Sequence, residues 1–141
     1  MKLSKLIRAD FLPHSTDAGL LLLRVWLGLG MFLIHGLGKL QNFNATVAYF
    51  REGMGIPTIF GIAAILAESI AAILLVIGLA TRWSALTLAI TMAVAFVLKH
   101  EMTLKQGHPN SGEIAFLYLG GFLAILLAGA GRWSVDVTLG R

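Results

Sequence analysis

The amino-acid sequence predicts an all-α integral membrane protein, a four-helix bundle of antiparallel, up-down spans with a short interfacial helix between spans one and two. Of its 141 residues, 57% are hydrophobic and only 13% are charged, whereas a soluble domain is about 45–50% apolar and about 25% charged. A domain this small cannot bury so much apolar surface by folding alone, because its surface-to-volume ratio is high. We therefore expect a lipid bilayer around it, which excludes a secreted disulfide module, a disordered tail and an ordinary cytosolic enzyme.

Four apolar segments are expected to be the spans. They cover residues 18–37, 56–80, 83–98 and 114–130. About 17–25 residues cross the hydrocarbon core of a bilayer, so the second segment is long enough without further argument. The third and fourth are shorter, and Trp83 and Trp133 fit the role of interfacial anchors at their ends. The prediction is a single transmembrane domain over residues 1–141, with no room for a domain outside the membrane.

The connections between the spans support this count. The segment NFNATVAYFREGMGIP follows span one, with Asn44 as its candidate N-cap. Its residues Val47, Phe50 and Met54 share one helical face, which predicts a short interfacial helix. Only GLATR joins spans two and three, so these spans should be antiparallel neighbours. The polar stretch KHEMTLKQGHPNSGE, with several helix-breaking residues, separates spans three and four.

The distribution of Lys and Arg predicts the orientation. With an even number of spans, both termini and the GLATR turn lie on one side of the membrane. That side holds six Lys or Arg residues, against four on the other. Loops rich in Lys and Arg stay in the cytoplasm, so we expect both termini to be cytoplasmic.

Several classes of chemistry are excluded by the residues that the sequence lacks. It has no cysteine, so thiol–disulfide exchange and thiolate metal sites are ruled out. Its formal net charge of +4 comes from single basic residues between apolar runs, which is not the pattern of a nucleic-acid-binding surface. No Walker loop, HExxH motif or nucleophile elbow occurs. We expect no nucleic-acid partner and no metal site.

Two charged residues lie inside the predicted spans, where charge is costly. Arg24 lies about 9 Å inside span one and Glu68 lies near the middle of span two. A charge at the bilayer centre costs at least about 2.5–3.5 kcal/mol, so such residues tend to pair or to serve a function. Their predicted heights differ by about 5 Å, which allows an Arg24–Glu68 ion pair. That pair could simply pin two helices, Arg24 could instead extend to the interface, or Glu68 could carry a proton under the control of Arg24.

A second set of polar residues is expected at the outer leaflet. His35 and Lys39 end span one, His100 ends span three and Glu113 opens span four. Such a set could form a pocket for a quinone head group or for proton exchange, although a solvated interfacial residue is the simpler interpretation of His100. Axial ligation of a haem b by His35 and His100 is a further alternative, which no spacing rule supports.

Several short motifs occur in order along the chain. They are R-V-W-L-G and H-G-L-G-K-L in span one, the single mid-span Glu68, G-L-A-T-R after span two, and G-A-G-R-W-S-V-D after span four. With this order and hydropathy, the sequence from Ala18 to Asp136 resembles the DoxX family, small four-helix proteins of bacterial inner membranes. The resemblance implies a multi-pass protein of the bacterial inner membrane.

The same resemblance implies a link to redox chemistry rather than one substrate. The family takes its name from a subunit of a terminal quinol oxidase, and its members are linked to thiosulfate–quinone oxidoreduction, oxidative stress and quinone or catechol resistance. Our leading hypothesis is a membrane subunit of a quinone-linked redox or oxidative-stress system, acting with redox partner proteins. Glu68 and Arg24 would then be catalytic, with substrate-binding residues His35, Lys39, His100 and Glu113.

Two other function classes remain open at this stage. The first is a non-catalytic membrane anchor or assembly factor, in which the intramembrane charges dock partner proteins. The second is a small-molecule or ion carrier, which would have to form a homo-oligomer because four short helices enclose little volume.

Overall fold

The computed structural model describes residues 7–9 and 11–140, and every regular element in that part of the chain is helical. The all-α prediction is therefore confirmed. Three helices are long and apolar enough to cross a membrane, and a fourth apolar helix is shorter. The extent of these apolar helices implies association with a lipid bilayer.

The first long helix runs from Thr16 to Gln41. It consists of α2 (Thr16–Gly30), a π-helical segment η1 (Met31–Gly36) and α3 (Leu37–Gln41). Ser15 caps its N-terminus, where the side-chain oxygen accepts the backbone N–H of Ala18 at 3.2 Å. The helix continues for four residues beyond the predicted end of span one, because a helix need not stop where its apolar run stops.

The predicted short helix after span one is present as α4 (Phe43–Ala48) and η2 (Tyr49–Gly53). The prediction of Asn44 as its N-cap is wrong, because Asn42, two residues earlier, occupies that position. Asn42 makes no capping bond and instead donates from its side-chain amide to the Gly38 carbonyl at 3.1 Å. Its backbone bends the chain directly from one helix into the next, so Asn44 is already helical.

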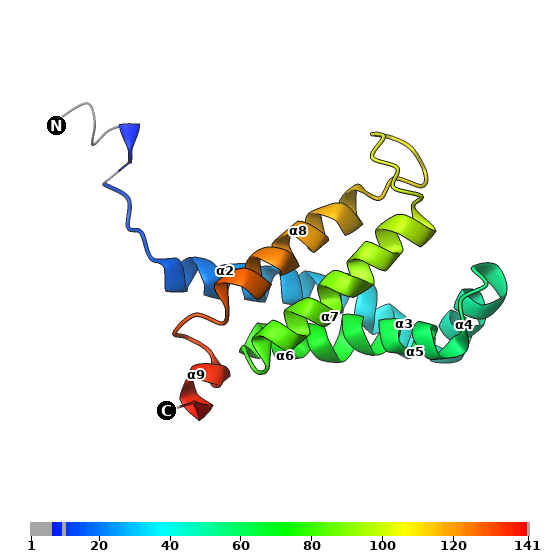
Figure 1. Ribbon diagram of the computed structural model, residues 1–141, viewed down its shortest axis with the longest axis horizontal. Coiled ribbons are helices and arrows are strands. Elements are labelled where there is room, and N and C mark those ends of the chain that lie inside the picture. The colour runs from blue at the N-terminus through cyan, green and yellow to red at the C-terminus, as the bar shows by residue number, and fades with distance from the viewer. Residues whose placement is uncertain (1–6, 10, 141) are drawn as a thin grey trace.

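The second long helix comprises α5 (Thr58–Leu66), η3 (Ala67–Ala71) and α6 (Ala72–Ile77), and the third comprises α7 (Thr81–Val94) and η4 (Ala95–Lys99). The fourth apolar helix is α8 (Glu113–Ala128), and the short α9 (Val135–Leu139) follows it. The start of α2, the turn between α6 and α7, and α9 lie at one end of the molecule (Figure 1). The α4 helix and the loop between α7 and α8 lie at the other end (Figure 1).

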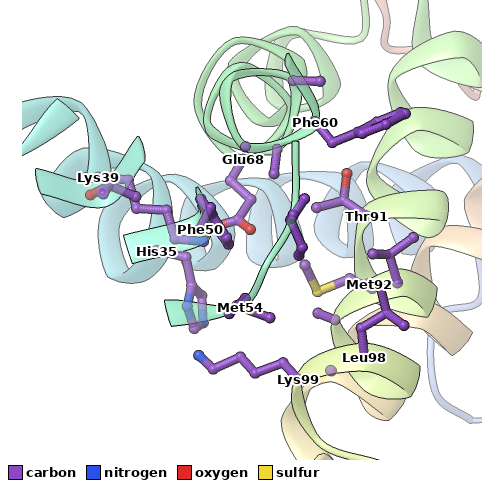
Figure 2. Close-up of a pocket in the computed structure, with 18 of the residues that line it drawn as sticks. His35, Lys39, Phe50, Met54, Phe60, Glu68, Thr91, Met92, Leu98 and Lys99 are labelled. Carbon is purple, nitrogen blue, oxygen red and sulfur yellow. Dashed lines mark hydrogen bonds and ion pairs between the residues drawn. The ribbon is translucent and has the colours of Figure 1, made fainter. Parts of the chain in front are cut away.

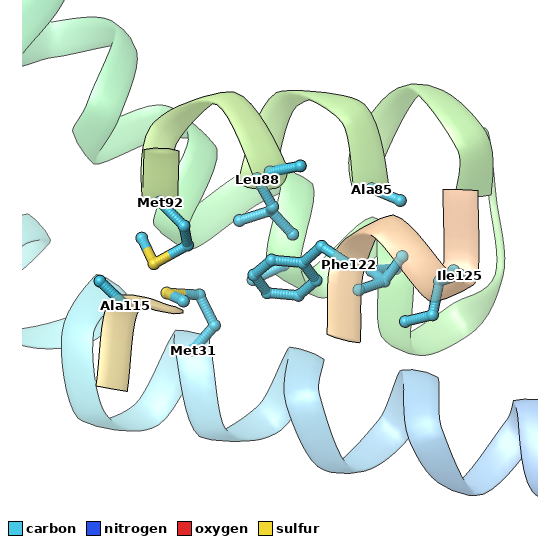
Figure 3. Packing of buried hydrophobic residues seen from close by; sticks show 10 residues of the cluster. Met31, Ala85, Leu88, Met92, Ala115, Phe122 and Ile125 are labelled. Carbon is cyan, nitrogen blue, oxygen red and sulfur yellow. The ribbon is translucent and has the colours of Figure 1, made fainter. Parts of the chain in front are cut away.

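The buried core lies between the four apolar helices. Its largest members come from η1, α6, α7 and α8 (Figure 3), and they are Met31, Leu75, Leu88, Met92, Phe122 and Ile125. Packing is most extensive between α7 and α8 and between α2 and α6. Large apolar side chains such as Trp26 and Leu127 are exposed on the outside, as expected for a surface that faces lipid.

Each of the three long helices contains a π-helical segment. These segments are η1, η3 and η4, and η1 packs directly against η3. A π-helical segment widens the helix and is often found at a functional site. The sequence pattern did not predict these segments, and they carry or adjoin the polar side chains described next.

Candidate functional site

A cavity of about 1100 Å³ lies at the end of the molecule that carries α4 and the loop between α7 and α8. Its lining comes from η1 and α3, the segment from α4 to η2, α5 and η3, α7 and η4, and the start of α8. Most of the lining is apolar. The polar side chains that line it are His35, Lys39, Thr46, Tyr49, Glu68, Thr87, Thr91, Lys99, His100, Ser111 and Tyr118.

The innermost charges of the cavity are an ion pair between Lys39 of α3 and Glu68 of η3 (Figure 2). The Glu68 side chain is 5% exposed and that of Lys39 is 27% exposed, so the pair lies at the inner wall of the cavity rather than on the surface. The Lys39 ammonium also lies 5.7 Å from the centre of the Phe50 ring, a cation–π distance. Lys39 thus has two partners, one acidic and one aromatic.

Gly36 allows the two helices that carry this ion pair to approach closely. A Cβ atom on Gly36 would overlap the backbone carbonyl of Glu68 in the facing helix. This contact lies within the packed pair η1 and η3. The absence of a side chain at Gly36 therefore sets the distance between Glu68 and the helix that carries Lys39.

Aromatic and hydroxyl groups complete the polar wall. The ring of His35 meets the ring of Tyr118 edge-on at 5.9 Å. Thr91 donates its hydroxyl to the Thr87 carbonyl at 2.9 Å, which leaves its oxygen able to accept a hydrogen bond. At the edge of the cavity, Nδ1 of His100 lies 3.2 Å from the Asn110 carbonyl and holds the following loop against the helix end.

Four of the six site residues predicted from the sequence line this one cavity. They are His35, Lys39, Glu68 and His100. The other two do not line it. Glu113 lies exposed at the start of α8, and Arg24 lies near the opposite end of the molecule.

The Arg24–Glu68 ion pair that the sequence allows is not formed, because Glu68 pairs with Lys39. Arg24 is fully buried and donates to the Leu75 carbonyl at 3.4 Å and the Trp133 carbonyl at 2.6 Å. Leu75 is seven residues beyond Glu68, or about 10 Å further along the helix. The heights predicted from the span boundaries were therefore too similar, and Lys39 is the residue that reaches Glu68.

Arg24 belongs to a polar cluster that holds the end of the chain, which we call the terminal cluster (Arg24, Gly78, Thr81, Trp133 and Asp136). The Asp136 backbone N–H donates to the Gly78 carbonyl at 2.8 Å. The Asp136 carboxylate accepts the backbone N–H groups of Ala80 at 2.6 Å and Thr81 at 2.8 Å. Gly78 has a φ of +74°, and a Cβ there would overlap the Arg24 guanidinium. The role of this cluster is to join helices and not to line the cavity.

The surroundings of Asp136 favour its charged form. Burial alone would raise the pKa of this carboxyl, but hydrogen bonds from Thr81 and Ala80 and the nearby Arg24 guanidinium outweigh that effect. The pKa of Asp136 therefore lies below its ordinary value of 3.8. Asp136 is ionised at neutral pH.

Many residues of the cavity lining were absent from the predicted site, among them Lys99, Tyr118 and Phe50. Lys99 was not selected although it adjoins His100, and Tyr118 and Phe50 gave no polar signal in the apolar pattern. Tyr118 could have been found, because a phenol inside an otherwise apolar span usually has a polar contact.

In the part of the chain that the structure describes, no group of three or more His, Asp or Glu side chains could hold a metal ion.

Comparison with known proteins identifies the family. The DoxX family model matches residues 19–101, which is more than half of the chain. The chain belongs to the DoxX family. The match covers the three long helices and almost all of the helices around the cavity, whereas α8 and the terminal cluster residues after it lie beyond it.

Individual DoxX relatives match over most of their length. The chain is 34% identical to the putative oxidoreductase CatD of Bacillus subtilis over 105 residues, which is 74% of this chain and 73% of that protein. It is 34% identical to the inner membrane protein YphA of Escherichia coli over 112 residues, 75% of this chain and 80% of YphA. It is 28% identical to the inner membrane protein YqjF of Escherichia coli over 134 residues, 89% and 95% of the two chains. No solved structure matches the chain.

Proposed function

We propose that this DoxX protein is an inner-membrane subunit of a quinone-linked redox system, and that the quinone head group binds in the cavity beside Glu68. The observation that carries the proposal is the cavity itself, which combines a buried ion pair at its inner wall with an apolar mouth. A membrane quinone has the same two parts, a polar ring and an apolar tail.

The mouth of the cavity supports entry from the bilayer. Among the residues that line the cavity, several apolar side chains are more than half exposed on the outside of the protein. They are Phe60 at 64%, Ile90 at 56%, Leu98 at 59% and Ile114 at 60%. In a membrane these surfaces contact acyl chains, so a lipophilic molecule can reach the cavity without passing through water.

The polar wall fits the proton chemistry of a quinol. Oxidation of a quinol releases two electrons and two protons. In this proposal Glu68, which lines the cavity, accepts one proton at the inner wall, and the second proton passes to water at the polar end of the cavity. Lys39 pairs with Glu68 and holds the carboxylate at the inner wall. The electrons pass to a redox partner protein, consistent with the description of the relative CatD as a putative oxidoreductase.

We further propose that the four apolar helices form an antiparallel bundle in the bacterial inner membrane, with both termini in the cytoplasm. The names of the relatives YqjF and YphA support the inner-membrane location, and the Lys and Arg distribution supports the orientation. The ends of the helices alternate between the two ends of the molecule (Figure 1). In this orientation the cavity lies towards the outer leaflet.

The test is a search for quinone in the purified protein. The wild-type protein and a Glu68→Gln variant are purified in mild detergent, and their organic extracts are quantified by mass spectrometry. The control is Glu52→Gln, which removes an exposed carboxylate that pairs with its neighbour Arg51 and does not line the cavity. We expect near-stoichiometric quinone in the wild-type and control proteins and a clear loss in Glu68→Gln.

An absence of quinone from well-folded wild-type protein would contradict the proposal. The remaining interpretation would then be the non-catalytic anchor or assembly factor, and a search for a stoichiometric protein partner would follow. Quinone that is retained fully in Glu68→Gln would keep the quinone link but remove Glu68 from the site.

A further inference from the structure

The two lysines that line the cavity differ in whether their charge is neutralised. Lys39 pairs with Glu68 and lies over the Phe50 ring. Lys99, the last residue of η4, forms no ion pair with a carboxylate within residues 7–9 and 11–140. Among the described residues of the lining, Glu68 is the single acidic one, against two lysines. Counting the lysines and the glutamate alone, the lining has one more positive than negative charge, and the lysine without an acidic partner is Lys99.

Lys99 lies on the wall shared by two adjoining cavities, where a bound head group would contact it. It lines the large cavity and also a smaller adjoining one of about 390 Å³, formed with Tyr49, Met54 and Leu98 among others. Its side chain extends from η4 towards His35 (Figure 2). Lys99 therefore adjoins the polar loop that begins at His100, while its side chain reaches into the cavity lining.

Helix electrostatics alone account for part of this placement. A lysine in the last turn of a helix interacts favourably with the helix dipole, by about 0.3–1 kcal/mol. The helix dipole would act on Lys99 equally if no cavity adjoined its side chain and no apolar residues lay beside it. The neighbouring exposed side chains Leu98 and Ile114 are apolar, so a cation here faces hydrocarbon and water at the same time.

We propose that the cavity binds an amphiphile with an anionic head group, and that Lys99 binds the anion. The apolar lining holds the hydrocarbon part, and the uncompensated ammonium selects a carboxylate or a phosphate over a neutral head group. This inference rests on one part of the proposed function, that the cavity is open to lipid. It goes further by specifying that the bound molecule carries a negative charge.

The test uses photo-crosslinking in nanodiscs of phosphatidylcholine. One arm uses a diazirine-bearing fatty acid and its methyl ester, which differ only in the anionic head. A second arm uses a diazirine-bearing lysophosphatidic acid and the matching monoacylglycerol. Cross-linked peptides are mapped and quantified by mass spectrometry, and the quinone content of each protein is measured in parallel.

Three variants accompany the wild-type protein. Lys99→Gln removes the charge, Lys99→Arg keeps it, and the control Lys105→Gln removes an exposed lysine of the same loop region that does not line the cavity. We expect anionic probes to label cavity-lining peptides, and Lys99→Gln to reduce this labelling about tenfold, the effect of losing one charge-assisted contact. Lys99→Arg and Lys105→Gln should label like the wild type. The arm with stronger labelling identifies the head group as carboxylate or phosphate.

Equal labelling by the anionic probes and their neutral counterparts would overturn the inference, as would unchanged labelling in Lys99→Gln or labelling confined to peptides outside the cavity. The parallel quinone measurement separates the two proposals. Lys99-dependent labelling in a protein without quinone would support the anion site and contradict the quinone-linked function. Bound quinone together with equal labelling by the anionic and neutral probes would support the quinone-linked function and contradict the anion site.

Discussion

The carboxylate of Asp136 accepts the backbone N–H of Thr81 at 2.8 Å, although 55 residues separate them in the sequence. Thr81 is the first residue of α7, and the residue before it, Ala80, has a left-handed backbone with a φ of +48°. No local side chain caps α7. Asp136 therefore supplies from the end of the chain the N-terminal cap that the tight α6–α7 turn lacks.

The first prediction concerns this long-range cap. Asp136→Ala should lower the free energy of unfolding by about 0.5–2 kcal/mol, the usual cost of losing an N-cap side chain. Asp136→Asn should cost less, because an amide oxygen still accepts one N–H. Thermal unfolding in detergent measures both, with Glu52→Ala as the exposed control. An Asp136→Ala protein as stable as that control would show that the cap contributes nothing.

The second prediction is the pH dependence of the same contact. The pKa of Asp136 is lowered in the folded protein relative to its ordinary 3.8, so its stabilisation is complete above that value and is lost as the pH falls through the lower folded pKa. The difference in unfolding temperature between wild type and Asp136→Asn should therefore be constant near neutral pH and shrink in acid. A difference that grows on acidification would contradict the lowered pKa.

The third prediction compares two glycines on one helix. A Cβ on Gly36 would overlap the Glu68 carbonyl, whereas a Cβ on Gly38 meets nothing within 4 Å. Gly36→Ala should separate the first and second long helices and destabilise the protein by at least about 1 kcal/mol, in the range of overpacking. Gly38→Ala should be neutral or stabilising, because alanine favours the helix. Thermal unfolding of the two variants tests this, and equal effects would argue against the close approach.

The helices could be predicted because their signals are local. Apolar runs and connection lengths gave the long helices and the short helix after the first of them, with errors of a few residues at their ends. The motifs G-L-A-T-R and G-A-G-R-W-S-V-D were recognised as similar to those of the family. Their contact through Asp136 was not predicted, because no rule of sequence spacing relates residues 55 apart.

The candidate site could be predicted only in part, because its geometry depends on rotation and register. Placing Glu68 by height alone suggested Arg24 as its partner, but Lys39 is on the correct turn and face of the first helix. Each π-helical segment rotates the residues that follow it around the helix axis. A prediction that assumes 3.6 residues per turn throughout therefore assigns those residues to the wrong face. Glu113 was included for its position in the sequence, and it lies exposed outside the cavity.

The fourth prediction tests the Lys39–Glu68 ion pair for both stability and function. Removing one partner of a buried pair leaves an uncompensated charge, and replacing both removes that cost. Lys39→Met should be more destabilising than Glu68→Gln, because it leaves a carboxylate that is 5% exposed, whereas Lys39 at 27% exposure can still reach a polar surface. The Lys39→Met and Glu68→Gln double variant should recover stability relative to Lys39→Met alone.

Unfolding of the four proteins by titration with a denaturing detergent gives the interaction energy of the pair. Quinone content, measured on the same preparations, separates structure from function. If Glu68 is only a partner that holds the helix of Lys39, the double variant should regain quinone together with stability. If Glu68 is the proton acceptor beside the quinone, the double variant should regain stability and still lack the ligand. A double variant no more stable than Lys39→Met would show that the two charges do not act as a pair.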